Sequence, residues 1–181
     1  MLKFSAVLAG ALLAASPVMA QTVMVGGQAM YPQKNIIENA MNSADHTTLV
    51  AAVKAAGLVD ALQGKGPFTV FAPTNAAFGL LPAGTVDNLV KSENKEMLTK
   101  ILTYHVVAGN YTRSKLWKLI KDGKGTAHLK TLAGSELTFK MNGPDNIVVI
   151  DSKGNTAVIS TYDVNQSNGV IQVVDKVLMP S

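Results

Sequence analysis

Residues 101–111 read ILTYHVVAGNY. A phenol and an imidazole, Tyr104 and His105, stand side by side in this otherwise apolar run. An imidazole in such a place serves as a catalytic base, as a metal ligand, or as a group that joins parts of the fold by hydrogen bonds. The choice separates an enzyme from a binding module, and it depends on what the rest of the sequence supplies.

The sequence favours a structural role for the pair over catalysis. A catalytic histidine needs a nucleophile within hydrogen-bond reach and a third group that orients the ring. There is no G-x-S-x-G motif, and no serine or threonine stands in a recognisable strained turn. We expect Tyr104 to bury its ring while its hydroxyl finds a partner, and His105 to use one ring nitrogen as donor and the other as acceptor. No catalytic residue is predicted.

A metal site is not predicted either. The three histidines, His46, His105 and His128, are far apart, and the chain has no cysteine, whereas zinc takes three or four nitrogen or sulfur ligands. Residues 151–155, DSKGN, resemble a calcium loop only superficially, because Lys153 stands where an oxygen ligand is needed. This stretch is better interpreted as a hairpin turn, and no cofactor is expected.

The first twenty residues have the pattern of a secretory signal peptide. Lys3 precedes an apolar run over 6–15, and the segment ends in Val18-Met19-Ala20. The run is shorter than the roughly 20 residues that a membrane span needs. We therefore expect cleavage after residue 20 and no membrane span in the mature protein.

The remaining 161 of 181 residues suit one domain that is stabilised by its core. Because the chain has no cysteine, an exported protein of this sequence depends on packing alone. The 16 Lys and Arg against 12 Asp and Glu give a net charge of +4, or +3 without Lys3. Aromatic residues are only 6% and do not alternate with basic ones, so a nucleic-acid partner is not expected.

Helical and strand patterns occupy different halves of the chain. Residues 21–32 show no clear periodicity and are interpreted as a flexible lead-in. Helical spacing follows, with Ser43 or Asp45 as a possible N-cap and Gly57 as a C-terminus. From Thr131 onward, apolar residues tend to recur at every second position, as in a strand with one buried face. The first predicted helix runs from the Ser43 or Asp45 cap to Gly57, and others cover 58–62 and 86–107, the last with a break near Ser92. A helical turn is predicted at 74–78. The predicted strands cover 68–72, 137–141, 147–150, 155–160 and 169–179. This segregation predicts the α+β class.

Three stretches together resemble the signature regions of the fasciclin (FAS1) domain family: FTVFAPTNAAF (68–78), LTYHVVAGNY (102–111) and SNGVIQVVDKVLMP (167–180). The stretch SADHTTLVAAVKAAGLVDAL (43–62) is similar to the opening helices of that family. Their order and spacing match over residues 33–180. The resemblance implies a single domain with a wedge-like β-sandwich and several helices packed against it.

The resemblance also assigns roles to residues. Its structural signature would be Phe71, Pro73, Thr74, Asn75, Phe78, Asn168, Gly169 and Asp175. In animal members the region of the Tyr-His pair is implicated in receptor binding, which makes Tyr104, His105, Asn110 and Tyr111 candidate partner contacts. The chain departs from the family at Gln172, where many members have histidine, so a role of that second histidine is in doubt here.

Residues 113–124, RSKLWKLIKDGK, form the densest basic patch of the chain. Helical spacing would turn Leu116, Leu119 and Ile120 inward. It would place the basic side chains outside: Arg113, Lys115, Lys118, Lys121 and Lys124. The stretch is either an ordinary solvated helix face or a contact for an anionic surface such as an acidic polysaccharide, lipid headgroups or teichoic-type polymers.

The composition predicts an exported, disulfide-free globular domain, and the resemblance implies a non-catalytic adhesion or interaction module that is secreted and then periplasmic or held at the cell surface. Its expected partner is an extracellular or surface protein or polysaccharide, with self-association as a further option. Two other classes stay open. One is a carrier for an apolar small molecule, a lipid or pigment, and the other is a hydrolase.

Overall fold

The computed structural model describes residues 22–181, so the expected signal peptide lies outside the described residues. The helices are α1 (Ile36–Asn42), α2 (Thr47–Ala56), α3 (Val59–Gln63), α4 (Asn75–Gly79), α5 (Thr85–Leu89), α6 (Lys95–Tyr104) and α7 (Arg113–Asp122), with 3-10 turns η1 (Ala44–His46) and η2 (Ser92–Asn94). The strands are β1 (Val23–Val25), β2 (Gln28–Met30), β3 (Phe68–Pro73), β4 (Val106–Ala108), β5 (Thr126–Lys130), β6 (Glu136–Asn142), β7 (Asn146–Ile150), β8 (Thr156–Gln166) and β9 (Gly169–Val174).

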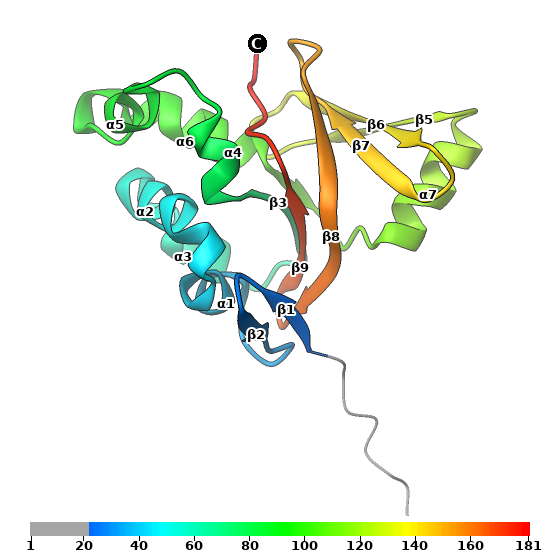
Figure 1. Cartoon of the computed structure of the whole chain (residues 1–181), viewed down its shortest axis with the longest axis horizontal. Helices are drawn as coiled ribbons and strands as arrows, with labels where there is room; N and C mark the ends of the chain where they lie inside the picture. Colours follow the sequence, from blue (N-terminus) through cyan, green and yellow to red (C-terminus); the bar gives the residue numbers. More distant parts are fainter. Residues whose placement is uncertain (1–21) are drawn as a thin grey trace, which may run out of the picture.

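The centre of the domain is a seven-stranded sheet in the order β4-β3-β9-β8-β7-β6-β5 (Figure 1). All pairs are antiparallel except β3 with β9. A bridge between Val107 and Thr131 links the two ends of this order, so the sheet folds over and nearly closes. The α+β class is confirmed, and the expected sandwich is one continuous sheet folded upon itself.

Strand β8 makes the fold possible because it belongs to both halves of the sheet. Its first residues pair with β7 and its later ones with β9. The register with β9 shifts twice between Ile159 and Val164, and Asp163 there has a φ of 56°. Such bulges bend a strand and increase its twist, and aspartate is one of the few residues that tolerate positive φ.

Two apolar clusters fill the domain. One lies between the helices α1–α6 and the sheet around β3 and β9, and it contains Ile36, Leu49 and Val70. The other lies inside the folded sheet under α7 and contains Phe71, Leu116 and Phe139. Figure 1 shows α1–α3 on one side of β3 and β9, and α7 on the far side beside β5 and β6.

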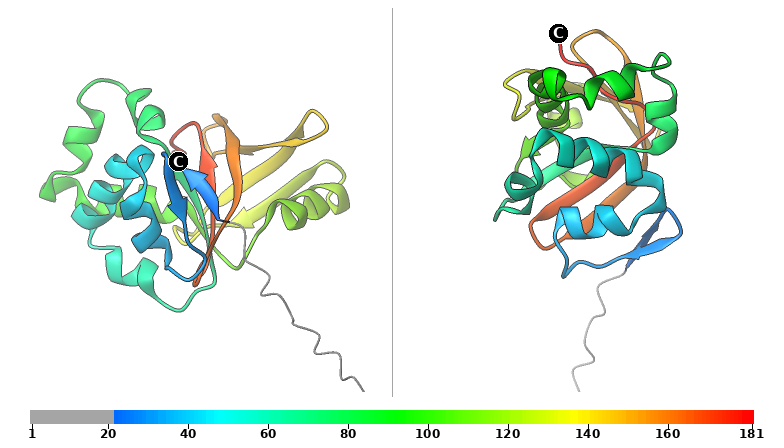
Figure 2. Two further views of the ribbon diagram at one scale, coloured as in Figure 1. Left: turned by 60° about the horizontal axis from the view of Figure 1, so that its bottom comes forward. Right: turned by 90° about the vertical axis from the view of Figure 1, so that its left-hand side faces the viewer.

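The N-terminal segment differs from the expectation of a flexible lead-in. Residues Val23–Met30 form a hairpin in which Val25 and Met30 are buried. Its turn, Gly26-Gly27, has φ values of 59° and 72°, which two-residue hairpin turns require and glycine adopts without strain. Figure 2 shows the hairpin beside α1. No periodicity marks so short a hairpin in the sequence, and burial against α1 and β8 is what fixes it.

Helix α1 was not predicted, and the expected cap of α2 is wrong. Asn35 and Glu38 form a capping box at the start of α1. The hydroxyl of Ser43, expected to cap the next helix, instead bonds to Nδ1 of His46 at 2.8 Å. Gly57 does end α2 in the left-handed conformation, as predicted.

Candidate functional site

His105 is buried at the C-terminal end of α6, with 2% of its surface exposed. Its Nε2 accepts a hydrogen bond from the backbone N–H of Leu178 at 2.9 Å, so Nδ1 carries the ring proton and donates it to the Ile101 carbonyl at 2.9 Å. Burial lowers the pKa of His105 from 6.5 to about 4, although the Ile101 carbonyl and Asp151 act in the opposite direction. The neutral ring thus ties α6 to the C-terminal segment.

Tyr104 faces the other apolar cluster, and its ring is fully buried. The hydroxyl donates to the Glu136 carbonyl at 2.9 Å and accepts from the backbone N–H of Ser152 at 2.8 Å. Burial raises the pKa of Tyr104, so the phenol stays protonated. The turn that it holds, residues 151–155, is the hairpin turn expected there: Asp151 Oδ1 accepts from the backbone N–H groups of Lys153 and Asn155.

The pair is therefore not a contact surface in itself. Neither Tyr104 nor His105 is accessible to a partner, since all their polar atoms are engaged inside the domain. The expectation of direct partner contact through these two side chains is corrected by their burial. The Ser152 hydroxyl lies 2.8 Å from the Tyr104 hydroxyl, and both ring nitrogens of His105 bond to backbone groups. Among residues 22–181, no side-chain nucleophile is therefore hydrogen-bonded to His105.

The signature residues of the resemblance join separate elements. Asn75 bonds through its amide to Ala44 and Thr48, and Thr74 caps α4 by accepting from Ala77. The side-chain amide of Asn168 accepts a hydrogen bond from the Ile36 N–H and donates hydrogen bonds to the carbonyls of Leu62 and Gly64. Three further signature residues are buried: Phe71, Pro73 and Phe78. The Asp175 carboxylate accepts a hydrogen bond from the Val158 N–H. Gly169 lies so close to Phe68 that a Cβ atom on it would meet the Phe68 carbonyl oxygen at 2.0 Å.

Gln172, the position at which the resemblance implies histidine, is completely buried. Its amide accepts from the Asp163 backbone at 3.0 Å and donates to the Tyr111 carbonyl at 3.0 Å and to Asp163 Oδ1 at 2.9 Å. Asp163 also accepts from the Arg113 backbone at 2.7 Å. Gln172 thereby fixes the start of α7 to the bulge in β8. The sequence could not reveal this link, because the three partners meet only in the folded chain.

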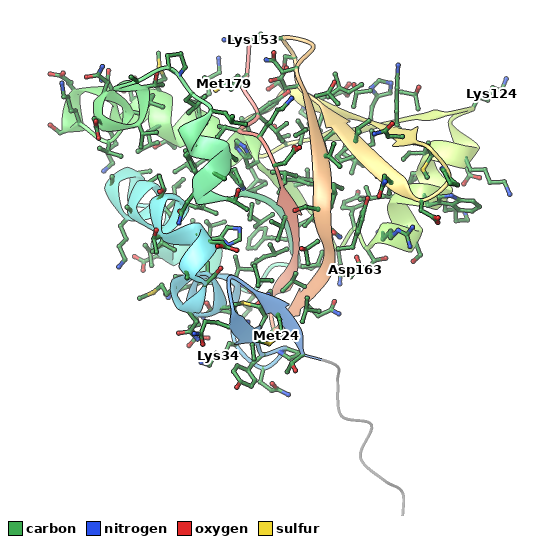
Figure 3. All side chains as sticks on the ribbon, viewed as in Figure 1. Met24, Lys34, Lys124, Lys153, Asp163 and Met179 are labelled. Atoms are coloured by element: carbon green, nitrogen blue, oxygen red, sulfur yellow. The ribbon has the colours of Figure 1, made fainter. Side chains whose placement is uncertain are left out.

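Helix α7 places most of the basic patch on the outside, as predicted. We call this face the α7 surface: Asn110, Tyr111, Lys115, Trp117, Lys118, Lys121 and Lys124. Figure 3 shows Lys124 at an outer corner of the molecule. Leu116 and Ile120 point inward and are buried, while Leu119 is partly buried. Arg113 lies at the edge, where it pairs with Asp145 at 3.2 Å.

The charges of the α7 surface are only partly compensated. Lys118 pairs with Asp122 at 3.2 Å, and within residues 22–181 no carboxylate pairs with Lys115, Lys121 or Lys124. Lys115 lies over the ring of Tyr111 at 4.4 Å, and Lys121 over the ring of Trp117 at 5.1 Å. The indole is 45% exposed. Cations and aromatic faces therefore alternate along one accessible surface.

Two of the four candidate partner contacts belong to this surface rather than to the Tyr-His pair. Asn110 is exposed, and its carbonyl accepts from Lys115 Nζ at 3.3 Å. Tyr111 is half-buried and anchored by its backbone N–H to Thr69 at 2.8 Å. The structure thus regroups the sequence-predicted sites: Tyr104 and His105 lie inside, whereas Asn110 and Tyr111 adjoin the basic helix.

An apolar pocket lies on the opposite side of the domain, among the β1–β2 hairpin, the helices α1–α3, and β3 and β9. Its cavity volume is about 40 Å³. Aliphatic side chains dominate the walls, and Ser43, His46 and His105 are the polar exceptions, with Lys54 at the exposed rim. No sequence pattern indicates this pocket, since its walls also include residues of α6, β4 and β8 and so combine elements that are far apart in the chain.

Among the described residues, no three His, Cys, Asp or Glu side chains are grouped so that they could hold a metal ion. Within the same part of the chain, no helix has the length and apolar character that crossing a membrane requires.

The comparisons with known proteins agree with this architecture. The fasciclin domain family matches residues 44–180. The chain is 50% identical to "Protein sll1483" of Synechocystis sp. over 80% of this chain and 73% of that protein. It is 38% identical to the cell surface glycolipoprotein MPB83 of Mycobacterium bovis over 86% of this chain and 64% of that protein.

A solved structure supports the fold. A FAS1 domain pair from the insect cell adhesion molecule fasciclin I superposes with a TM-score of 0.72 at 20% identity, over 81% of this chain and 51% of the pair. At that identity the likeness concerns the fold alone. The match over residues 44–180 and the 50% identical relative settle the classification: the chain belongs to the fasciclin (FAS1) domain family.

Proposed function

We propose that this protein is a non-catalytic adhesion module that works outside the cytoplasm, at the cell surface or in the periplasm, and that it binds acidic polysaccharide through the α7 surface. The observation that carries the proposal is a set of three lysines, Lys115, Lys121 and Lys124, that pair with no carboxylate of residues 22–181. Lys121 lies over the exposed indole of Trp117. A relative that is named a cell surface glycolipoprotein supports the location.

The chemistry of the α7 surface suits a polyanion. Unpaired lysines on one face attract a chain of negative charges over a distance of about 10 Å at moderate salt. The helix itself is firmly seated by Leu116 and Ile120, so it presents these charges without rearrangement. The rings of Tyr111 and Trp117 hold Lys115 and Lys121 in place, since each ammonium lies over one of the rings. One domain would bind weakly, and several copies on one surface would raise the avidity.

The test compares two triple variants that remove the same charge. K115Q/K121Q/K124Q changes the α7 surface, and K65Q/K91Q/K153Q changes exposed lysines elsewhere. Binding to immobilised alginate, with neutral dextran as the reference polymer, should fall at least tenfold in the first variant and less than twofold in the second. Wild-type binding should weaken steeply with added salt. Equal binding by both variants would overturn the proposal.

A second candidate function, a carrier for an apolar small molecule, is favoured by one observation: the apolar pocket among the hairpin, α1–α3 and the sheet. A pocket with aliphatic walls and few polar groups is typical of small-molecule sites.

A further inference from the structure

One wall of the pocket is formed by residues that precede the region matched by the family. The matched region begins at residue 44, whereas Val25 and Met30 of the hairpin and Ile36 of α1 line the pocket. The hairpin closes tightly on the turn that follows α1, because a Cβ atom on Gly26 would come within 2.8 Å of Ser43 Oγ. The N-terminal segment therefore supplies one wall of the cavity, and residues inside the matched region supply the others.

One polar atom in this apolar wall has no partner. His46 is 3% exposed, and its Nδ1 bonds to Ser43 Oγ at 2.8 Å. Its Nε2 is buried and makes no hydrogen bond of normal geometry within residues 22–181. The backbone of Ala72 lies close enough to oppose the effect of burial on the pKa of the ring. His105 lines the same pocket with both nitrogens engaged, so it differs from His46 in this respect. A buried polar atom without a partner is uncommon in a native fold and indicates a ligand or a bound solvent molecule.

The chemistry around His46 selects the kind of ligand. Burial lowers the pKa of His46, so the ring is neutral near neutral pH. A charged head group would be poorly solvated among aliphatic walls. The bond between Nδ1 and the Ser43 hydroxyl forms in either direction, which leaves Nε2 as donor in one tautomer and acceptor in the other. A hydroxyl group can bond to Nε2 in both cases.

We propose that this pocket binds a small aliphatic alcohol, with its hydroxyl hydrogen-bonded to His46 Nε2 and its hydrocarbon chain against the aliphatic walls. The cavity of about 40 Å³ is about three times what a single water needs, which suits a short chain. Val50 is partly exposed and Lys54 is exposed at the rim, which marks the entrance along α2. This inference deepens the carrier candidate and is independent of the α7 surface.

The experiment uses the full chain labelled with ¹⁵N and titrated with ethanol or ethane, whose two or three heavy atoms match the cavity of about 40 Å³. Long-range ¹H–¹⁵N spectra distinguish the three histidines. Ethanol should shift the Nε2 signal of His46 saturably, leave exposed His128 unchanged, and lose its effect in Ala40→Leu, which fills the pocket but keeps His46. In His46→Leu, the affinity for ethanol relative to ethane should fall about tenfold, the equivalent of one hydrogen bond.

The outcomes separate the alcohol from the carrier candidate. In one outcome, ethane and ethanol bind saturably with the same affinity ratio in wild type and His46→Leu, with no shift at His46. That result would overturn the alcohol but keep an apolar carrier. No saturable binding of either molecule would overturn both, and the cavity would then hold water only. Should His46→Leu fail to fold, the His46 shift and the Ala40→Leu variant still decide.

Discussion

His105 Nε2 accepts a hydrogen bond from the backbone N–H of Leu178 at an N···N distance of 2.9 Å, and this bond joins residues 73 positions apart in the sequence. One residue earlier, Tyr104 holds the turn at Ser152, and Asp151 in that turn accepts from the backbone of Met179 at 3.0 Å. The two neighbours therefore secure the C-terminal segment from two sides. Figure 3 places Met179 beside the start of the long strand β8, at the end of the domain opposite Met24.

His105→Ala should lower the free energy of unfolding by about 2–4 kcal/mol. The change leaves the Leu178 N–H and the Ile101 carbonyl without partners and opens a cavity in the core. Chemical denaturation should show this loss, whereas His128→Ala, at an exposed site, should change stability by less than about 0.5 kcal/mol. The folded fraction of His105→Ala should bind alginate as wild type does. Wild-type stability with lost binding would reverse the structural assignment.

Tyr104→Phe should cost about 1–3 kcal/mol, because the ring remains but the Ser152 N–H and the Glu136 carbonyl lose their buried partner. Tyr162 provides a comparison, since its hydroxyl accepts a single bond from the Ile147 N–H at 2.8 Å. Tyr162→Phe should cost less. Amide hydrogen exchange should rise in residues 151–155 of Tyr104→Phe only. Unchanged exchange there would show that the phenol does not hold this turn.

Much of the fold was predictable from the sequence, for local reasons. Period-two alternation marks β6, apolar runs between turn residues mark β7 to β9, and the apolar spacing marks α2 and α7. The α1 helix was missed although Asn35 and Glu38 carry a capping-box signal. The nearly closed sheet and the pocket were beyond such patterns, because they depend on the bulge at Asp163 and on contacts between distant elements.

The features of the candidate sites were likewise only partly predictable from the sequence. The amphipathic spacing of α7 predicted which lysines face solvent, because helix periodicity alone decides it. The sequence could not tell that Tyr104 and His105 are buried, since an apolar run with two polar residues fits a core or a surface groove equally well. Nor could it single out His46, whose buried nitrogen depends on Ser43 and on the hairpin around Gly26.

Gln172→Leu should destabilise the domain by about 2–4 kcal/mol, because a fully buried amide that makes three hydrogen bonds is replaced by an apolar side chain. Besides the lower free energy of unfolding, we expect local loosening at the start of α7, because Gln172 holds this end through Asp163 and the Tyr111 carbonyl. Faster amide exchange at Arg113, together with weaker alginate binding, would link this core residue to the α7 surface. Gln166→Leu, a second buried glutamine, provides the control. Equal effects on α7 exchange would refute the link.

Acid should destabilise the domain through His105. Because burial holds its pKa at about 4 against 6.5 in the unfolded chain, the unfolded state binds more protons between these values. The free energy of unfolding therefore falls as pH drops from about 6.5 towards 4, by at most on the order of 3 kcal/mol from this residue. The lowered pKa of His46 acts in the same direction.

His105→Gln isolates this contribution, since glutamine keeps a donor and an acceptor but does not titrate. Urea denaturation of wild type and variant from pH 7.5 to 4.0 should show a steeper loss in wild type, and the difference between the curves should grow below pH 6.5. Both proteins contain the same carboxylates, so the contribution of these groups to the pH dependence of stability cancels in that difference. Parallel curves would mean that His105 is not held neutral by the fold, and that the bond from the Leu178 N–H is not what fixes its ring.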